Sequence, residues 1–192
     1  NILILGLDSR EPESDLGRSD TVILSTFMPG EPYLGMLSIP RDLWVTIPVY
    51  GENRINAAHF FAEADVPGSG PEAAMQTVRQ NFGVDVHSYI RIRFDGFLDL
   101  VDLLGGVEVE LSVPMSGYPE GTHHLNGEQA LAFVRDRAGS DDFYRMQRSQ
   151  IFLKALLKRV FDPTIWRKLP KMVPLFVEMI DTDLPLNKWP TL

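Results

Sequence analysis

The chain begins with an uninterrupted apolar run that stops at a charged residue. Ile2 to Leu7 carry no polar side chain, and Asp8 follows them directly. Six such residues are too few for a typical helix, but they match the length of a strand that is covered on both faces. The run therefore predicts a buried strand, followed by a polar loop that starts near Arg10.

Four later segments also have strand patterns. Thr21–Phe27 and Tyr33–Ile39 are β-rich runs on either side of a turn rich in Pro and Gly, so they predict a hairpin. Val86–Phe94 predicts a half-buried strand, with its isoleucines on the apolar side and its arginines on the polar side. Val107–Val113 alternates apolar and polar residues and predicts another strand.

Helical patterns lie between and after these strands. Pro71–Phe82 has apolar residues at four-residue spacing and ends at a glycine, and Phe97–Leu104 ends at a glycine pair. Asn126 can cap a helix over Gly127–Val134. A longer helix is predicted over Asp142–Phe161. Its apolar face consists of Phe143, Met146, Ile151, Leu153, Leu157 and Val160.

The predicted elements alternate along the chain without internal repeats or low-complexity segments. Such alternation is typical of an α/β fold in which helices flank a central mixed sheet. The 192 residues are enough for one well-buried domain and too few for two of ordinary size. We therefore expect a single α/β domain over residues 1–192.

Charge and composition exclude several classes of protein. The chain has 26 acidic and 18 basic residues and a net charge of −8, so it would repel a nucleic-acid backbone. It has no cysteine, which excludes disulfides, thiolate nucleophiles and cysteine-ligated zinc. No stretch is apolar for long enough to cross a membrane. Because the chain enters a strand directly and does not start with Met, we expect a targeting or anchoring segment to precede it.

Arginine carries most of the positive charge, and it carries all of it in the first 153 residues. Thirteen of the 18 basic residues are Arg, and all five Lys lie at or after Lys154. Arginine can bind a phosphate through two N–H groups at once and does not lose its proton. Codon usage alone could produce the same overall ratio, so the clustering of the arginines is the more informative observation.

Six arginines lie beside predicted strands or form close pairs: Arg18, Arg41, Arg135, Arg137, Arg145 and Arg148. Arg135 and Arg137 would share one side of an extended chain. Arg145 and Arg148 are neighbours on one face of the predicted helix. Six guanidinium groups could converge on a multiply charged anion such as a pyrophosphate. For any single one of them, a structural ion pair is the simpler interpretation.

Two carboxylates lie close to these arginines in the sequence. Asp8 ends the first strand, and Asp20 follows two residues after Arg18. Mg²⁺ typically takes one or two carboxylates and completes its shell with phosphate oxygens and water. Arginines together with Mg²⁺ indicate phosphoryl-group chemistry. The adjacent pair His123–His124 does not have the spacing of a zinc site.

Six motifs, in order along the chain, resemble those of the LytR-CpsA-Psr family. They are NILILGLDSR at 1–10, GRSDT at 17–21, SIPRD at 38–42, RINAA at 54–58, LGGV at 104–107, and LNGEQAL at 125–131 followed by Arg135 and Arg137. The resemblance runs from Asn1 to about Lys158. It implies an extracytoplasmic bacterial domain, normally held by an N-terminal membrane helix, with an apolar pocket for a lipid.

The resemblance also implies an activity. Members of the family transfer a glycopolymer, such as a teichoic acid or a capsule, from a polyprenyl-pyrophosphate carrier onto peptidoglycan, and they use Mg²⁺ or Mn²⁺. Asp8 and Asp20 resemble the metal-binding carboxylates of the family. The residues that resemble its pyrophosphate-binding arginines are Arg18, Arg41, Arg135, Arg137 and Arg145, with Arg148 in the same patch.

The predicted catalytic residues are Asp20, Arg41 and Asp42. One of the two carboxylates would take the proton of the attacking sugar hydroxyl, and the guanidinium would stabilise charge on the leaving phosphate. Two features depart from the family pattern. The stretch Pro114–His124 is shorter than is usual in the family, and Ser149 stands where a Gln commonly follows the last arginine. The second departure puts one polar contact to the phosphates in question.

Two other functions stay open. In a polyprenyl-pyrophosphate hydrolase, water would replace the sugar acceptor, and the same arginines and aspartates would serve. In a binding module that sequesters lipid-linked phosphate or regulates envelope assembly, paired carboxylates would be unnecessary. Removal of Asp8 or Asp20 separates the last case from the first two, because turnover would collapse in an enzyme while a passive binder would keep its affinity.

Overall fold

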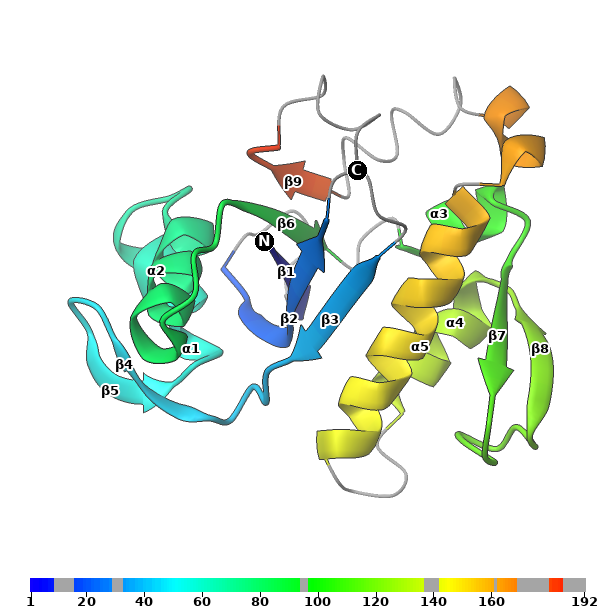
Figure 1. The fold of residues 1–192 in the computed structure, drawn as a ribbon, viewed down its shortest axis with the longest axis horizontal. Helices are drawn as coiled ribbons and strands as arrows, with labels where there is room; N and C mark the ends of the chain where they lie inside the picture. Colours follow the sequence, from blue (N-terminus) through cyan, green and yellow to red (C-terminus); the bar gives the residue numbers. More distant parts are fainter. Residues whose placement is uncertain are drawn as a thin grey trace. The chain divides into compact units, whose positions relative to one another are not determined.

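The chain divides into two units, residues 1–94 together with 180–192, and residues 95–179 (Figure 1). The structure is a computed structural model that describes residues 1–8, 16–28, 33–93, 97–136, 142–160, 162–168 and 180–184. Each unit has buried apolar side chains of its own. Each unit holds part of the predicted site. The predicted site residues from Asp8 to Asp42 belong to the first unit, and those from Arg135 to Arg148 belong to the second.

A five-stranded mixed sheet forms the centre of the first unit, with the strand order β3-β2-β1-β6-β9. The strands are β1 (Ile2–Asp8), β2 (Arg18–Phe27), β3 (Leu34–Ser38), β6 (Ser88–Arg93) and β9 (Ile180–Thr182). β1 and β6 run parallel, and the other neighbours run antiparallel. β1 is an interior strand and is buried from residue 2 to residue 7, which confirms the prediction from its apolar run.

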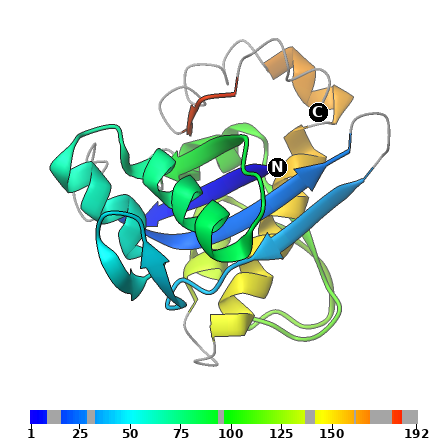
Figure 2. The ribbon, with the colours of Figure 1, turned by 60° about the vertical axis from the view of Figure 1, so that its left-hand side comes forward.

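Two helices, α1 (Ala57–Asp65) and α2 (Gly70–Phe82), pack against each other and against the sheet of this unit (Figure 2). A small hairpin of β4 (Trp44–Ile47) and β5 (Gly51–Arg54) packs against α2. α2 ends as its glycine predicts, because Gly83 has φ 65° and its N–H donates to the carbonyl of Arg79 at 3.0 Å. The core between the sheet and these helices includes Leu3, Leu5, Val22 and Leu24 from the strands and Ala58, Met75 and Val78 from the helices.

The second unit consists of a hairpin and helices. Its elements are α3 (Phe97–Leu103), β7 (Val107–Leu111), β8 (Gly121–Leu125), α4 (Gly127–Arg135), α5 (Asp142–Val160) and the 3-10 helix η1 (Pro163–Lys168). α5 packs along β7, and α4 packs against both α3 and α5 (Figure 1). The rings of Phe97 and Phe152 lie 5.0 Å apart between their centroids and join α3 to α5.

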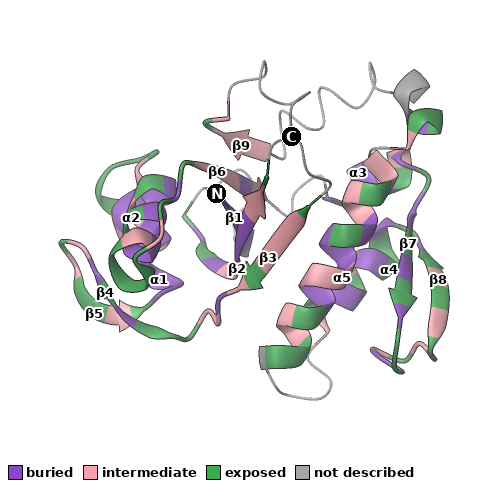
Figure 3. Ribbon diagram, viewed as in Figure 1, coloured by how far each residue is buried: buried purple, intermediate pink, exposed green. Residues whose placement is uncertain are grey.

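The ribbon in Figure 3 is coloured by the burial of each described residue. The exposed fractions of three residues contradict expectations from the sequence. Phe143 does not belong to a buried helix face, because its position near the start of α5 leaves it 69% exposed. Val113 lies beyond the end of β7 and is 48% exposed. Arg91, predicted on the polar side of its strand, is the most buried residue of β6, with 5% exposure, because charged partners meet it there.

The predicted α/β fold with a central mixed sheet and flanking helices is confirmed. The sequence did not predict β4, β5, α1, β8 or β9. Phe94 and Phe161, which the predicted strand and helix include, lie outside the described residues. Within the described part of the chain, no helix is both long and apolar enough to cross a bilayer.

Candidate functional site

The first part of the site lies where β1 ends and β2 begins. Gly6 pairs with Thr21, but Leu7 pairs with Ser19, so Asp20 is an extra residue in β2. Such a β-bulge bends the strand and redirects a side chain, and bulges are common beside functional sites. Gly6 suits this point because a Cβ there would lie 3.0 Å from the Cβ of Thr21.

Arg18 and Asp8 are direct neighbours in this register. The backbone of Asp8 pairs with that of Arg18, one residue beyond the pair of Leu7 and Ser19. The side chain of Arg18 is exposed, whereas Ser19 is buried. The side chain of Asp8 lies outside the description, so its predicted part in a metal site stays a prediction. The two motifs that the sequence singled out do meet at this end of the sheet.

A tight turn after β3 brings Arg41 to the same place. Its start is held by a bond from the amide of Ile39 to the carbonyl of Val22 at 2.8 Å, and the turn itself closes through a bond from Leu43 N to Pro40 O at 3.0 Å. Nη1 of Arg41 lies 2.8 Å from Oδ2 of Asp20. The structure therefore joins two predicted catalytic residues that are 21 positions apart in the sequence.

Asp42 and a further arginine extend this contact into a chain of alternating charges. Oδ2 of Asp42 lies 3.5 Å from Nε of Arg41, and its Oδ1 lies 3.1 Å from Nη1 of Arg54. Asp42 and Arg54 are about half exposed, whereas Arg41 and Asp20 are about three-quarters buried. Arg54 belongs to the RINAA motif at 54–58, and the pairing of β4 with β5 brings it beside Asp42.

The backbone of Asn56 links the turn to the start of β2. Its N–H donates to the carbonyl of Arg41 at 3.2 Å, and its carbonyl accepts from the amide of Ser19 at 3.4 Å. Asn56 is 4% exposed, and its side-chain Oδ1 has no hydrogen-bond partner in the described part of the chain. One buried residue before α1 thus holds together the two segments that carry Asp20 and Arg41.

The second unit carries the later arginines. Arg135 is the last residue of α4 and is exposed, and Arg145 is half-buried on α5. Arg148 is only 3% exposed, and its Nη2 donates to the carbonyl of Asp136. That bond ties α5 to the residue that follows α4. Arg137 lies outside the described residues, so its predicted pairing with Arg135 stays a prediction.

Arg148 differs from an ordinary surface arginine. Burial lowers the pKa of its guanidinium, Arg145 nearby lowers it further, and Asp136 acts in the opposite direction. No ion pair joins Arg148 to a carboxylate among the described residues, and its Nε has no hydrogen-bond partner there. The burial of Arg148 and its bond to the carbonyl of Asp136 hold its guanidinium in one place at the junction of α4 and α5.

The described side chains limit which kind of metal ion the predicted ligands Asp8 and Asp20 could hold. Among the described residues, no three His, Asp or Glu side chains gather in a way that could hold a metal ion. Asp20 nevertheless offers a partly buried carboxylate beside the end of the strand that carries Asp8. The described carboxylate of Asp20 suits a hard cation that draws most of its ligands from phosphate and water, and the predicted part of Asp8 stays a prediction.

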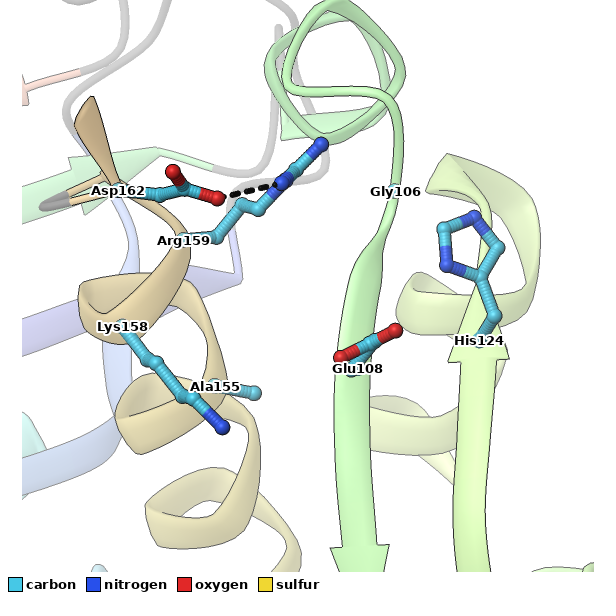
Figure 4. A pocket seen from close by; sticks show the side chains of 7 residues that line it. All are labelled: Gly106, Glu108, His124, Ala155, Lys158, Arg159 and Asp162. Atoms are coloured by element: carbon cyan, nitrogen blue, oxygen red, sulfur yellow. Dashed lines mark hydrogen bonds and ion pairs between the residues drawn. The ribbon is translucent and has the colours of Figure 1, made fainter. Parts of the chain in front are cut away.

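Two hollows also lie in the second unit, between α5 and β7. The first, of about 300 Å³, is lined by both acidic and basic side chains, among them Glu108, Lys158 and Arg159 (Figure 4). In it, Nη1 of Arg159 lies 2.9 Å from Oδ2 of Asp162. The second hollow measures about 410 Å³ and shares part of that lining. None of the predicted site residues that the structure describes lines either one, and the apolar lipid pocket stays a prediction.

Arginines and aspartates at strand ends of a mixed α/β fold are typical of proteins that bind phosphate groups. The model of the LytR_cpsA_psr family matches residues 1–192. The chain therefore belongs to this family, which confirms the resemblance in its motifs.

Relatives with names or structures agree with this assignment. Polyisoprenyl-teichoic acid–peptidoglycan teichoic acid transferase TagU of Oceanobacillus iheyensis is 37% identical over 198 residues, which cover 100% of this chain and 61% of that protein. The crystal structure of B. subtilis TagV matches with a TM-score of 0.76 and 28% identity, over 97% of this chain and 74% of that one. TagT bound to LI-WTA matches with a TM-score of 0.73 and 29% identity, over 97% and 70%.

The chain is shorter than these relatives. It spans 57% to 62% of the length of the first curated relatives that it matches. Their names and structures support the family and the fold directly.

Proposed function

We propose that this protein is a Mg²⁺-dependent phosphotransferase that moves a glycopolymer from a polyprenyl-pyrophosphate carrier onto peptidoglycan. It would act at the extracytoplasmic face of the bacterial membrane, held there by an N-terminal anchor. The names of the relatives support the two substrates, since TagU and TagT are each named polyisoprenyl-teichoic acid–peptidoglycan teichoic acid transferase. One observation carries the proposal: Arg41 is held between Asp20 and Asp42 at the bulged start of β2.

Arg41 would bind the pyrophosphate. Two carboxylates orient its guanidinium, so little reorganisation is needed when a phosphate arrives, and such preorganised donors are worth most where charge develops. Arg18 lies on the neighbouring stretch of β2 with its side chain exposed. In the second unit, Arg135 and Arg145 would add further donors, and Arg148 would supply a buried positive charge.

The reaction would be the exchange of one phosphoester bond for another. A hydroxyl oxygen of the acceptor attacks the phosphorus nearer the glycan and forms the new P–O bond. The bond from that phosphorus to the bridging oxygen breaks, and polyprenyl phosphate leaves with the electron pair. The hydroxyl proton passes to a carboxylate, that of Asp20 or Asp42. The arginines stabilise the charge that develops on the leaving phosphate.

Asp8 and Asp20 would hold the divalent cation. Mg²⁺ bound there would neutralise charge on the pyrophosphate oxygens. Because Oδ2 of Asp20 already contacts Arg41, the cation and the guanidinium would share this carboxylate group or compete for it. Mn²⁺ has similar ligand preferences and is expected to substitute for Mg²⁺.

The direct test uses the purified chain with a short-chain polyprenyl-pyrophosphate saccharide and a peptidoglycan oligomer. Parallel reactions contain Mg²⁺ or EDTA, and mass spectrometry identifies the products. We expect saccharide joined to the acceptor through one phosphate, and only with Mg²⁺. Free saccharide phosphate would instead identify a hydrolase. Unchanged lipid with measurable binding would identify a binding module.

Two variants separate these outcomes further. Asp20→Asn should abolish turnover in a transferase or a hydrolase, but it should preserve or raise lipid-phosphate affinity in a passive binder. Asp65→Asn is a matched control, because Asp65 lies at the end of α1 and contacts Tyr50 rather than an arginine of the site. Equal loss of activity in both variants would contradict a specific role for Asp20.

A further inference from the structure

A group of buried ionisable side chains lies in the first unit, and the proposed reaction makes no use of it. His59 is fully buried, and Glu63 and Arg91 are each 5% exposed. His59 and Glu63 lie one turn apart on α1, and Arg91 lies on β6. Burial of ionisable groups is costly, and an apolar cluster of the same volume is often at least as stable. The group therefore calls for an explanation other than stability.

Arg91 is held between two carboxylates. Its Nη1 lies 3.5 Å from Oε2 of Glu63, and its Nη2 lies 2.8 Å from Oδ2 of Asp181 on β9. Glu63 in turn accepts hydrogen bonds from the amides of Gly68 at 2.6 Å and Gly70 at 2.9 Å. These contacts fix the guanidinium in one position and orientation.

Arg91 determines which nitrogen of His59 carries a proton. Nε2 of His59 lies 3.4 Å from Nη1 of Arg91, and a guanidinium can only donate. In this contact Nε2 can therefore only accept, which is the arrangement of a ring that carries its proton on Nδ1. Nδ1 lies 3.1 Å from the carbonyl oxygen of Gly17 and donates to it. A substituent at Gly70 would disturb this arrangement, because a Cβ there would lie 2.7 Å from Nε2.

The carbonyl that His59 binds belongs to the peptide group that begins β2. That peptide joins Gly17 to Arg18, so its orientation sets the direction in which the chain enters the site. The next peptide is held as well, since the amide of Ser19 donates to the carbonyl of Asn56. His59 and Asn56, which make these two bonds, lie at the start of α1. The two peptides that they hold come just before the bulged residue Asp20.

We propose that His59 is a positioning residue, which fixes the Gly17–Arg18 peptide and thereby directs Arg18 and Asp20 toward the phosphate groups. Glu63 and Arg91 hold His59 in the required tautomer. This proposal rests on the proposed function for its effect on activity, but the hydrogen bond and the tautomer can be measured without turnover. His59 makes no contact with substrate in this role.

Three substitutions at His59 separate its two nitrogens. The amide nitrogen of Asn takes approximately the place of Nδ1, so His59→Asn can still donate to Gly17. The amide of Gln reaches the place of Nε2 instead, so His59→Gln loses the bond to Gly17, and His59→Leu loses both contacts. Thr77→Val is a matched control, because Thr77 is fully buried on α2 and, among the described residues, its hydroxyl bonds within that helix alone, to the carbonyl of Ala73.

The first measurement is by NMR and needs no substrate. Nitrogen spectra of the imidazole should show a neutral ring with the proton on Nδ1. The ¹⁵N shift of the Arg18 amide reports the hydrogen bond to the Gly17 carbonyl, so it should change in His59→Gln and His59→Leu. It should stay unchanged in His59→Asn and in Thr77→Val. A proton on Nε2, or the same Arg18 shift in all four variants, would overturn the proposal.

The second measurement is the transfer reaction. His59→Gln and His59→Leu should lower kcat at least about tenfold with little change in KM, because a misdirected group costs rate more than binding. His59→Asn should stay within about threefold of wild type. Wild-type kcat in His59→Leu would contradict the positioning role. If His59→Leu does not fold, the comparison of His59→Asn with His59→Gln decides.

Failure of the proposed function would look different. In that case the wild-type chain itself would show no turnover, while the tautomer and the Arg18 shift would still test the hydrogen bond. The probe would then be inorganic pyrophosphate with Mg²⁺. Its addition should shift the Arg18 amide in wild type and His59→Asn, and less in His59→Gln. Equal shifts in all three proteins would overturn the positioning role.

Discussion

At the scale of single residues, Arg41 shows why charge alone does not describe the site. Its Nη1 contacts Asp20 and its Nε contacts Asp42, so two nitrogens of one planar group pair with two different carboxylates. Lysine offers a single ammonium and cannot reproduce that fork. We expect Arg41→Lys to lower kcat/KM about 100-fold or more, the scale of losing one preorganised donor, measured in the transfer reaction.

A second arginine provides the control for this substitution. Arg79 on α2 also makes a forked contact, with Nη1 at 2.9 Å from Glu72 and Nε at 3.0 Å from the carbonyl of Val86, but it has no contact with the site residues. Arg79→Lys should cost some stability and leave kcat/KM within about threefold of wild type. Full activity in Arg41→Lys would mean that Arg41 is only a structural ion-pair partner.

Val49 is a residue whose backbone conformation does not suit its side chain. It has φ 72° and is 97% exposed, in a turn closed by a 3.1 Å bond from the amide of Tyr50 to the carbonyl of Ile47. A β-branched residue pays about 1–2 kcal/mol for this conformation. Glycine avoids that cost but loses about 0.5–1 kcal/mol to chain entropy.

We therefore expect Val49→Gly to raise the free energy of unfolding by about 0.5–1 kcal/mol, the difference between these two terms. The measurement is the urea midpoint at unchanged slope. Val49→Ala keeps the unfavourable φ and should gain little. A lower midpoint for Val49→Gly would show that the exposed side chain has a stabilising contact in solution.

At the scale of elements, α4 illustrates how local contacts define a boundary. The side chain of Asn126 accepts from the amide of Gln129 at 2.9 Å, and the side chain of Gln129 accepts from the amide of Asn126 at 3.0 Å. This capping box satisfies two N–H groups that the helix leaves open. The amide of Gly127 is satisfied separately by Asp102 of α3, at 2.7 Å.

Loss of the cap should destabilise the second unit. Asn126→Ala is expected to lower the free energy of unfolding by about 1 kcal/mol, whereas Asn126→Asp should keep most of it because a carboxylate can accept the same bond. Thermal unfolding of the three proteins measures this. Equal stability of the Ala and Asp variants would mean that the contact with Asp102 already holds the helix start.

The elements that the sequence predicted well are those with local signals of this kind. α2, α3 and α4 have a proline, a glycine or a cap at an end, and β1 is wholly apolar. β4 and β5 are four residues each and gain their stability from pairing with each other and packing on α2. β9 has three residues and depends on its pairing with β6. Nothing local marks such elements, so the sequence pattern missed them.

At the scale of the whole molecule, Tyr89 links alkaline pH to stability. Burial, followed by the nearby carboxylate of Asp181 and the hydrogen bond to it, raises the pKa of Tyr89 from 10.0 to about 12. The ionised form is therefore less favourable in the folded chain than in the unfolded one. This contribution to stability is complete below about pH 10 and is lost as the pH rises toward 12.

Tyr89→Phe tests this dependence. The variant lacks the bond from the tyrosine hydroxyl to Oδ2 of Asp181, at 3.1 Å, so it should be about 1 kcal/mol less stable than wild type at neutral pH. The difference should shrink above about pH 10, where wild type loses its advantage. Urea unfolding of both proteins across this range measures it. A constant difference at every pH would contradict the raised pKa.

The sequence by itself determined the alternation of strands and helices, the family, and the identity of the charged residues at strand ends. These follow from patterns that are local in the chain: apolar runs, glycines at helix ends, and short motifs. It also brought Arg18, Asp20, Arg41 and Asp42 to attention without any coordinates.

Tertiary structure decided what those residues touch. Arg41 reaches Asp20 and Arg54 reaches Asp42 only because β2, the turn after β3, and the β4–β5 hairpin come together. Arg91 is buried although the alternation along its strand predicted it on the polar side, because Glu63 and Asp181 contact it from α1 and β9. Contacts between distant segments have no local pattern, since they depend on how elements pack. Only the folded chain therefore shows that Asp20 is a bulged residue and that His59 holds the peptide before it.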